Sequence, residues 1–98
     1  MFRHGDVIIV PTDSIPAQAI PRPAAILARG EATGHSHRIE NPRSVELFDH
    51  EGMGYMRVTA PMARLVHDEH HPIELQHGTY RFWMQREYSP KEIRRIVD

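Results

Sequence analysis

The chain has no cysteine among its 98 residues. Without thiols it can form neither a disulfide nor a thiolate metal site, so any transition-metal site must use nitrogen and oxygen donors. Long apolar runs are also lacking: residues 7–10, Val-Ile-Ile-Val, are typical of its longest ones, and no secretory signal pattern precedes them. We therefore expect a soluble, cytoplasmic protein without a membrane segment.

A strong charge of either sign is lacking too. Twelve basic and thirteen acidic residues give a formal net charge of −1, so general nucleic-acid binding is not expected. The sequence contains no Gly-x-Ser-x-Gly elbow, no phosphate-binding glycine loop and no internal repeat. Its length predicts one domain, residues 1–98. Because a domain this small gains stability from a bound ion or a second subunit, a homo-oligomer stays open.

What the sequence does contain is a series of short β-type segments. The β-branched run at 7–10 stops at Pro11, and residues 44–48 and 55–59 flank a polar turn that predicts a hairpin. Further strands are expected within 35–39, 63–67, 72–75 and 79–88. The pattern predicts an all-β fold, a small barrel or sandwich of six to eight short strands.

Two segments depart from this strand pattern. Residues 11–23 carry four prolines and predict an ordered crossing loop or arm. Near the other end, Ser89 and Pro90 stand where a capping residue and a first helical residue belong, with Glu92 at the third helical position. They predict a short C-terminal helix, and a final edge strand over 93–97 is the alternative reading.

Histidine is the most informative residue type. The chain has eight, and seven of them fall between His35 and His77. Imidazole is the commonest protein ligand for transition metals. Alternate residues of a strand point to the same face, so His35 and His37 can present two ring nitrogens to one ion.

Gly30, followed after four residues by His35-Ser36-His37, is similar to the first metal motif of the cupins, an HxH pair with a nearby glutamate. Glu40 comes too soon after His37 for that pattern, and the final cupin histidine motif is not recognisable. This resemblance covers a short stretch and implies a metal site on a β-barrel.

The whole chain also resembles a small uncharacterised family of bacterial and phage-associated proteins. The shared phrases are Gly34-His35-Ser36-His37-Arg38 and Glu69-His70-His71-Pro72-Ile73. This resemblance implies a standalone domain and attaches no activity to it.

A second candidate group lies in residues 67–71. In a continuous strand His67, Glu69 and His71 would share one face, and residues of both faces could not all reach one ion. We therefore expect a divalent transition ion, with zinc among the candidates, bound by His35, His37, His67 and His71. Glu69 is the candidate general base and Glu40 a reserve ligand.

Ligand number decides what such a site would do. Three protein ligands with an open position permit Lewis-acid or activated-water chemistry, whereas four form a closed structural site. Whether the protein is an enzyme stays open. The plain alternative is that these histidines are ordinary polar residues on a solvent face, and His4, His50 and His77 are expected to be surface residues.

The competing prediction is a metal-free adaptor. Tyr80, Phe82 and Met84 alternate with Trp83 in the last strand, so the first three should face the core and Trp83 the opposite side. The adaptor would bind a protein partner or a second copy of itself through strand edges, the Pro-rich arm and the Trp83 face. A structural role for Trp83 is favoured over base stacking.

Overall fold

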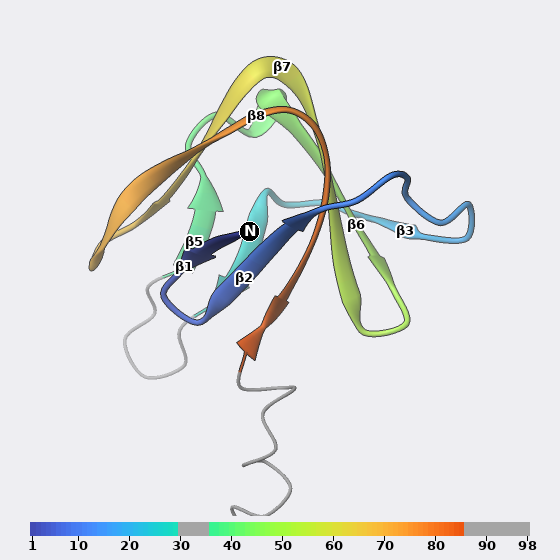
Figure 1. Cartoon of the computed structure of the whole chain (residues 1–98), viewed down its shortest axis with the longest axis horizontal. Helices are drawn as coiled ribbons and strands as arrows, with labels where there is room; N and C mark the ends of the chain where they lie inside the picture. The colour runs from blue at the N-terminus through green and yellow to red at the C-terminus, as the bar shows by residue number, and fades with distance from the viewer. Residues whose placement is uncertain (30–35, 86–98) are drawn as a thin grey trace, which may run out of the picture.

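The structure, a computed structural model, describes residues 1–29 and 36–85, which contain one antiparallel sheet of eight strands (Figure 1). The predicted all-β class and strand number are confirmed. The C-terminal segment expected to be helical and His35 lie outside the described residues. The strands are β1 Phe2–His4, β2 Val7–Pro11, β3 Ile20–Arg22, β4 Ile26–Arg29, β5 Ser36–Ile39, β6 Val45–His50, β7 Met53–His67 and β8 His70–Met84, with a 3-10 turn at Pro42–Ser44 before β6.

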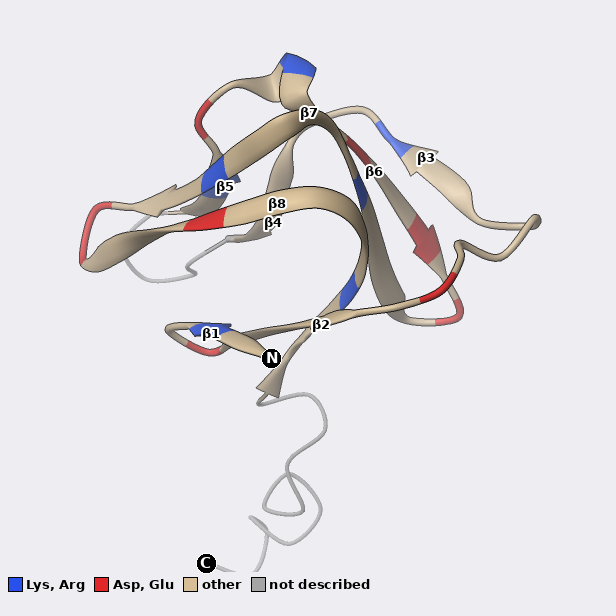
Figure 2. Ribbon diagram, turned by 45° about the horizontal axis from the view of Figure 1, so that its top comes forward, with Lys and Arg blue, Asp and Glu red and all other residues tan. Residues whose placement is uncertain are grey.

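Two long strands, β7 and β8, form the spine of the sheet. The main path runs β1-β2-β8-β7-β5-β4, while β6 pairs with the first half of β7 and β3 pairs with β6. The sheet is open, and β1 and β4 are the two ends of its main path. Both long strands bend, so that the β7–β8 hairpin arches over β1 and β2 (Figure 2).

The length of β7 and β8 differs from the expectation of several short strands. Each has fifteen residues, and β7 passes through Pro61 where a break was expected. Proline cannot donate a ladder hydrogen bond and is tolerated at a bulge. Pro61 lies where the β7–β8 register shifts, between Val58 and Met62. The proline therefore marks an irregularity inside one strand and does not end it.

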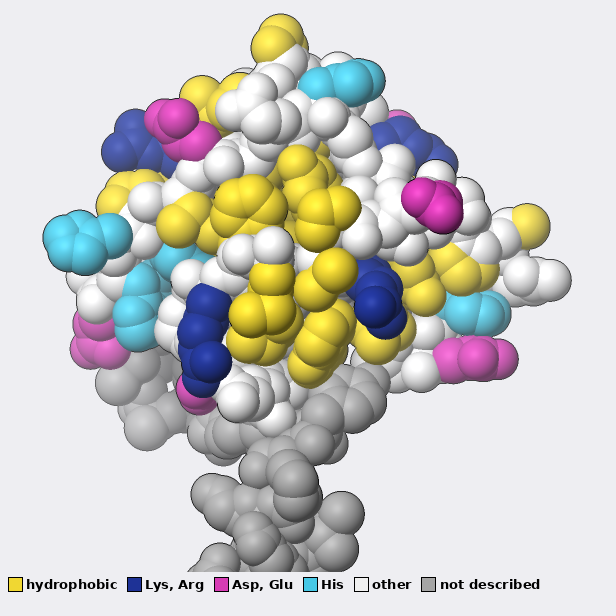
Figure 3. Space-filling model, viewed as in Figure 1, with side chains coloured by type: hydrophobic (Ala, Val, Ile, Leu, Met, Phe, Trp, Pro, Cys, Tyr) yellow, Lys and Arg dark blue, Asp and Glu magenta, His cyan; other side chains and the backbone are white. Residues whose placement is uncertain are grey.

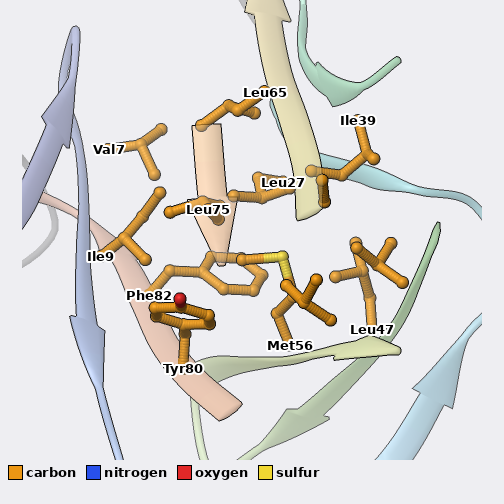
Figure 4. Close-up of a cluster of buried hydrophobic side chains, with 13 residues drawn as sticks. Val7, Ile9, Leu27, Ile39, Leu47, Met56, Leu65, Leu75, Tyr80 and Phe82 are labelled. Atoms are coloured by element: carbon orange, nitrogen blue, oxygen red, sulfur yellow. The ribbon is translucent and has the colours of Figure 1, made fainter. Parts of the chain in front are cut away.

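A core of apolar side chains fills the concave side of the bent sheet (Figure 4). Tyr80 and Phe82 are buried as predicted, and Met84 packs against the core. The closest fit is at Gly54, where an added Cβ would lie 2.4 Å from the Phe82 ring. The buried apolar residues are Val7, Ile8, Ile9, Leu27, Ile39, Val45, Leu47, Met56, Val58, Ala63, Leu65, Leu75, Tyr80 and Phe82.

The Pro-rich segment, residues 11–23, is hydrogen-bonded to the sheet. It contains strand β3, which was not predicted from the sequence. Arg22 of β3 donates from Nε to Asp49 Oδ2 at 3.0 Å and from a terminal nitrogen to the Ile26 carbonyl at 2.8 Å. These bonds join the arm to β6 and to β4. Within the described ranges, no helix has the length and apolar character needed to cross a membrane.

Candidate metal centre

Four histidines from separate segments meet where the two ends of the sheet approach each other. His67 ends β7 and His70 begins β8, and the two are cross-strand partners at the tip of that hairpin. β5 pairs with β7 through Arg38 and Val66, so one step further along this register His37 lies beside His67. His4, at the end of β1, reaches the group from the opposite side. We call these four side chains the histidine cluster.

The rings of the histidine cluster lie close together, and three of them are close enough for their nitrogens to reach one ion. The ring centroids of His37 and His67 are 4.3 Å apart, those of His67 and His70 4.7 Å, and those of His4 and His37 5.0 Å. One nitrogen each from His37, His67 and His70 lies within 4.8 Å of the other two. These three histidines could hold a metal ion.

Burial divides the cluster into a floor and an opening. His4 and His37 are 2% and 6% exposed, whereas His67 is partly exposed and His70 is exposed. Histidine side chains also reach the surface at several separate places on the molecule (Figure 3). The cluster is distinguished from such surface histidines by its buried half.

Burial also governs the charge of the two floor residues. It lowers the pKa of His4, and the nearby His70 and His67 lower it further, while a hydrogen bond to the His71 backbone opposes them. Burial is also the largest cause lowering the pKa of His37, to about 4, with the charges of His67, His4 and His70 adding to it and Asp6 opposing. Both imidazoles are therefore neutral at pH 7 and carry a nitrogen lone pair, as a metal ligand must.

Hydrogen bonds hold three of the four rings. His4 contacts the His71 carbonyl oxygen through Nε2 at 3.0 Å, and its Nδ1 lies 2.9 Å from His37 Nδ1. His67 accepts from the Glu69 backbone N–H at Nδ1, 2.9 Å away. An uncharged imidazole has one lone pair, so His67 would give up this bond on binding an ion. This bond joins the second residue of the turn to the residue before the turn, so it helps to shape the hairpin tip that presents His67 and His70.

Gly5 leaves the space in which the cluster sits. It follows His4 in the β1–β2 turn and has a φ of 63°, a conformation that favours glycine. A Cβ at this position would lie 2.7 Å from His70 Nε2 and 2.9 Å from His37 Cε1. A side chain here would therefore force the rings to move, so the glycine is needed both for the turn and for the site.

The structure describes three of the four predicted ligands, His37, His67 and His71. It brings His37 and His67 together, while His35 lies outside the described residues. The His71 side chain is exposed, and the residue meets the cluster through its backbone carbonyl. Glu69 is also exposed and contacts His67 through its backbone N–H. Glu40, the reserve ligand, is exposed after the end of β5.

Two members of the cluster, His4 and His70, were not in the predicted set. Both sit next to turns with signals in the sequence. Gly5-Asp6 before the apolar run at 7–10 marks a hairpin that carries His4 back onto the sheet. Asp68-Glu69 between two β segments marks a second one, and a turn there makes His67 and His70 direct partners.

The donor set determines which ions suit the site. Three imidazole nitrogens favour zinc, copper, iron or nickel over magnesium or calcium, which prefer oxygen. With three protein ligands a tetrahedral ion keeps one position for water or another small ligand.

The chain was compared with family models, with curated proteins and with solved structures, and only a family model matched. A family model covers residues 3–85, which include every member of the histidine cluster and all eight strands except the first residue of β1. The chain belongs to this family, described as a domain of unknown function, DUF8820.

Proposed function

We propose that this domain binds one divalent transition ion through His37, His67 and His70, with zinc as the first candidate. The observation that carries the proposal is the convergence of three imidazoles from β5, β7 and β8, with their ligand atoms within 4.8 Å of one another. His37 is 33 positions before His70 in the chain, and the two meet through the pairing of β5 with β7 and of β7 with β8. An ion accepting the lone pairs of the three rings would give this arrangement a function.

The energetics of the cluster support the same proposal. Imidazoles packed together repel when protonated, and burying a polar ring costs free energy unless its nitrogens are satisfied. The floor residues meet this cost by staying neutral and by bonding to each other and to His71. An ion that binds the folded chain and not the unfolded one would add stability in proportion to its affinity and concentration.

The exposed side of the cluster bears on what the ion would do. His70 is exposed and His67 partly so, so the open coordination position would face solvent. Zinc lowers the pKa of a bound water to about 7 in such three-ligand sites. Glu69, at the hairpin tip, is the carboxylate that we expected to serve as a base, and that role rests on the ion being present.

The proposal is tested by titrating tag-free protein with Zn²⁺ and Co²⁺, with elemental mass spectrometry of the dialysed complex. We expect one ion per chain, and a Co²⁺ absorption band typical of tetrahedral nitrogen coordination. His37→Ala should lose the ion, while His77→Ala, which changes an exposed histidine of β8, should keep it. An ion content that is near zero in the wild type, or equal in the two variants, would contradict the proposal.

The alternative function, a metal-free adaptor that binds through the Trp83 face, stays a prediction. Trp83 is half-buried beside Ile8 of β2, and the Arg81 guanidinium lies 5.5 Å from the centre of its ring. If this face joins two copies of the chain, Trp83→Ala should lower the oligomeric mass measured by light scattering and leave the metal content unchanged. A wild-type monomer would count against that reading.

A further inference from the structure

We infer that His4 is the positioning residue of this centre: it holds the hydrogen of His37 on Nδ1 and so leaves the Nε2 lone pair of His37 for the ion. The inference deepens the proposed function and rests on it. His4 lies on β1, apart from the three histidines whose nitrogens group together. It acts on the ion through His37.

A hydrogen bond to the backbone determines which ring nitrogen of His4 carries the hydrogen. His4 Nε2 lies 3.0 Å from the backbone oxygen of His71. A carbonyl oxygen only accepts hydrogen bonds, so the hydrogen must be on His4 Nε2. In a neutral imidazole the other nitrogen then carries the lone pair, so His4 Nδ1 is an acceptor.

The contact between the two rings then determines which nitrogen of His37 carries its hydrogen. The two Nδ1 atoms are 2.9 Å apart, a hydrogen-bond distance that requires one hydrogen between them. His4 Nδ1 has none to give while the ring is neutral, so His37 Nδ1 is the donor. His37 Nε2 is then the atom with a free lone pair.

Burial keeps both rings in this neutral arrangement. His4 is 2% exposed and His37 6%, and an unpaired charge at such positions would be costly. The result is a chain of two hydrogen bonds that runs from His37 through His4 to the His71 carbonyl. Metal-binding histidines commonly bond in this way through the nitrogen that does not face the ion, which fixes the ring and raises its basicity.

The location of His71 gives the chain a structural consequence. His71 is the second residue of β8, directly after His70. The backbone next to His70, one proposed ligand, therefore holds His4 in place. His4 in turn fixes the orientation of His37, another proposed ligand. β1 and the hairpin tip of β7 and β8 are joined at the centre even before an ion binds.

The first test needs no metal. Hydrogen–nitrogen correlation spectra of the histidine rings in the apo protein at neutral pH distinguish a hydrogen on Nδ1 from one on Nε2. We expect His4 with its hydrogen on Nε2 and His37 with its hydrogen on Nδ1. In His4→Phe, which keeps a ring in the space but has no acceptor, His37 should change to a mixture of both forms. A wild-type His37 with its hydrogen on Nε2 would overturn the inference.

The second test measures Zn²⁺ affinity with a matched pair of variants. His4→Phe should weaken binding about 10–100-fold, the usual cost of losing an outer partner of a metal ligand. His4→Asn places an oxygen near the lost Nδ1 and should restore most of the affinity. Equal weakening in both variants, with intact melting curves, would show that the effect is one of packing and would overturn the positioning role.

The remaining outcomes separate the two proposals. If metal loading shifts His4 Nδ1 as strongly as the three ligand nitrogens, His4 is itself a ligand and the inference is wrong while metal binding stands. If the wild type binds no ion but shows the expected hydrogens, the proposed function fails and the control of His37 by His4 is supported. Should His4→Phe fail to fold, the wild-type spectra still decide which ring nitrogens carry the hydrogens.

Discussion

The two turns at the ends of β7 have the same length but different surroundings. At one end β6 and β7 are joined by Glu51-Gly52, and at the other β7 and β8 are joined by Asp68-Glu69. Each turn has two residues between its strands, and each is preceded by a histidine. His50 closes the first turn opposite Met53, and His67 closes the second opposite His70.

The difference lies in what surrounds the two histidines. Glu51 and Gly52 have positive φ values of 49° and 81°, typical of the tight turn that suits a twisted hairpin, and this end of β7 serves to reverse the chain. His67 instead has His37 beside it and His70 across from it, with buried His4 closing the group. A histidine beside a turn can therefore contribute to a metal site only where the fold brings other donors to it.

The largest expected effect is a loss of Zn²⁺ affinity, tested by substituting one histidine beside each of the two turns. His70→Ala should reduce Zn²⁺ affinity by more than the roughly 10–100-fold loss typical of an outer-shell change, since it removes a direct ligand. His70 is exposed, so the variant should keep the apo melting temperature. His50→Ala, at the other turn, is the control and should bind as the wild type does in calorimetric titration. Equal affinities in the two variants would remove the distinction between the turns.

The second prediction concerns how the buried histidines His4 and His37 make the stability of the fold depend on pH. The lowered pKa values of His4 and His37 mean that, as pH falls below about 6.5, the unfolded chain takes up protons that the folded chain does not. The stability from these groups is complete above pH 6.5 and is lost progressively towards pH 4. At about 1.4 kcal/mol per pKa unit, His37 alone contributes a loss of up to roughly 3 kcal/mol.

Urea unfolding of the chelator-treated protein between pH 7.5 and 4 measures this loss. The free energy of unfolding should fall steadily through the window. In His37→Leu, which fills the space without titrating, the fall should be clearly smaller. Identical pH profiles for the wild type and the variant would show that burial of His37 does not govern the acid response.

Much of the sheet could be predicted from local sequence because strands leave a local signal. The alternation of Tyr80, Phe82 and Met84 gave the buried face of β8, and the polar segment 49–52 gave the β6–β7 hairpin. The continuity of β7 could not be predicted in the same way. Pro61 is a break signal in the sequence, and only the neighbouring strand shows that the pairing resumes after it.

The candidate site was harder to predict because it depends on a turn and on the bending of the sheet. In one continuous strand His67 and His70 would face opposite sides, so the expectation favoured His67 with His71. The turn at 68–69 resets the alternation and makes His67 and His70 partners. His4 was expected at the surface because it is near the N-terminus, yet the bending of the sheet brings it onto His37 and buries it.

The smallest effect separates the steric role of a glycine from its role in a turn. Gly5 and Gly52 both have positive φ, 63° and 81°, so alanine at either position should cost about 1–2 kcal/mol of stability. Only at Gly5 would the new methyl group lie against His70 and His37. Gly5→Ala should therefore also weaken Zn²⁺ binding about tenfold or more, as other disturbances around metal ligands do.

Gly52→Ala is the matched control for that prediction, because it carries the same kind of backbone strain at a turn outside the histidine cluster. Both variants should melt at lowered temperatures, Gly5→Ala at the lower one because its methyl group also displaces the rings of His70 and His37, and their Zn²⁺ affinities, measured well below those temperatures, should differ. If Gly5→Ala bound zinc as tightly as Gly52→Ala, the rings would have room to move aside, and the close approach of the β1–β2 turn would not shape the centre. If only Gly5→Ala lost affinity, the first turn of the chain would be part of the metal centre without contributing a ligand.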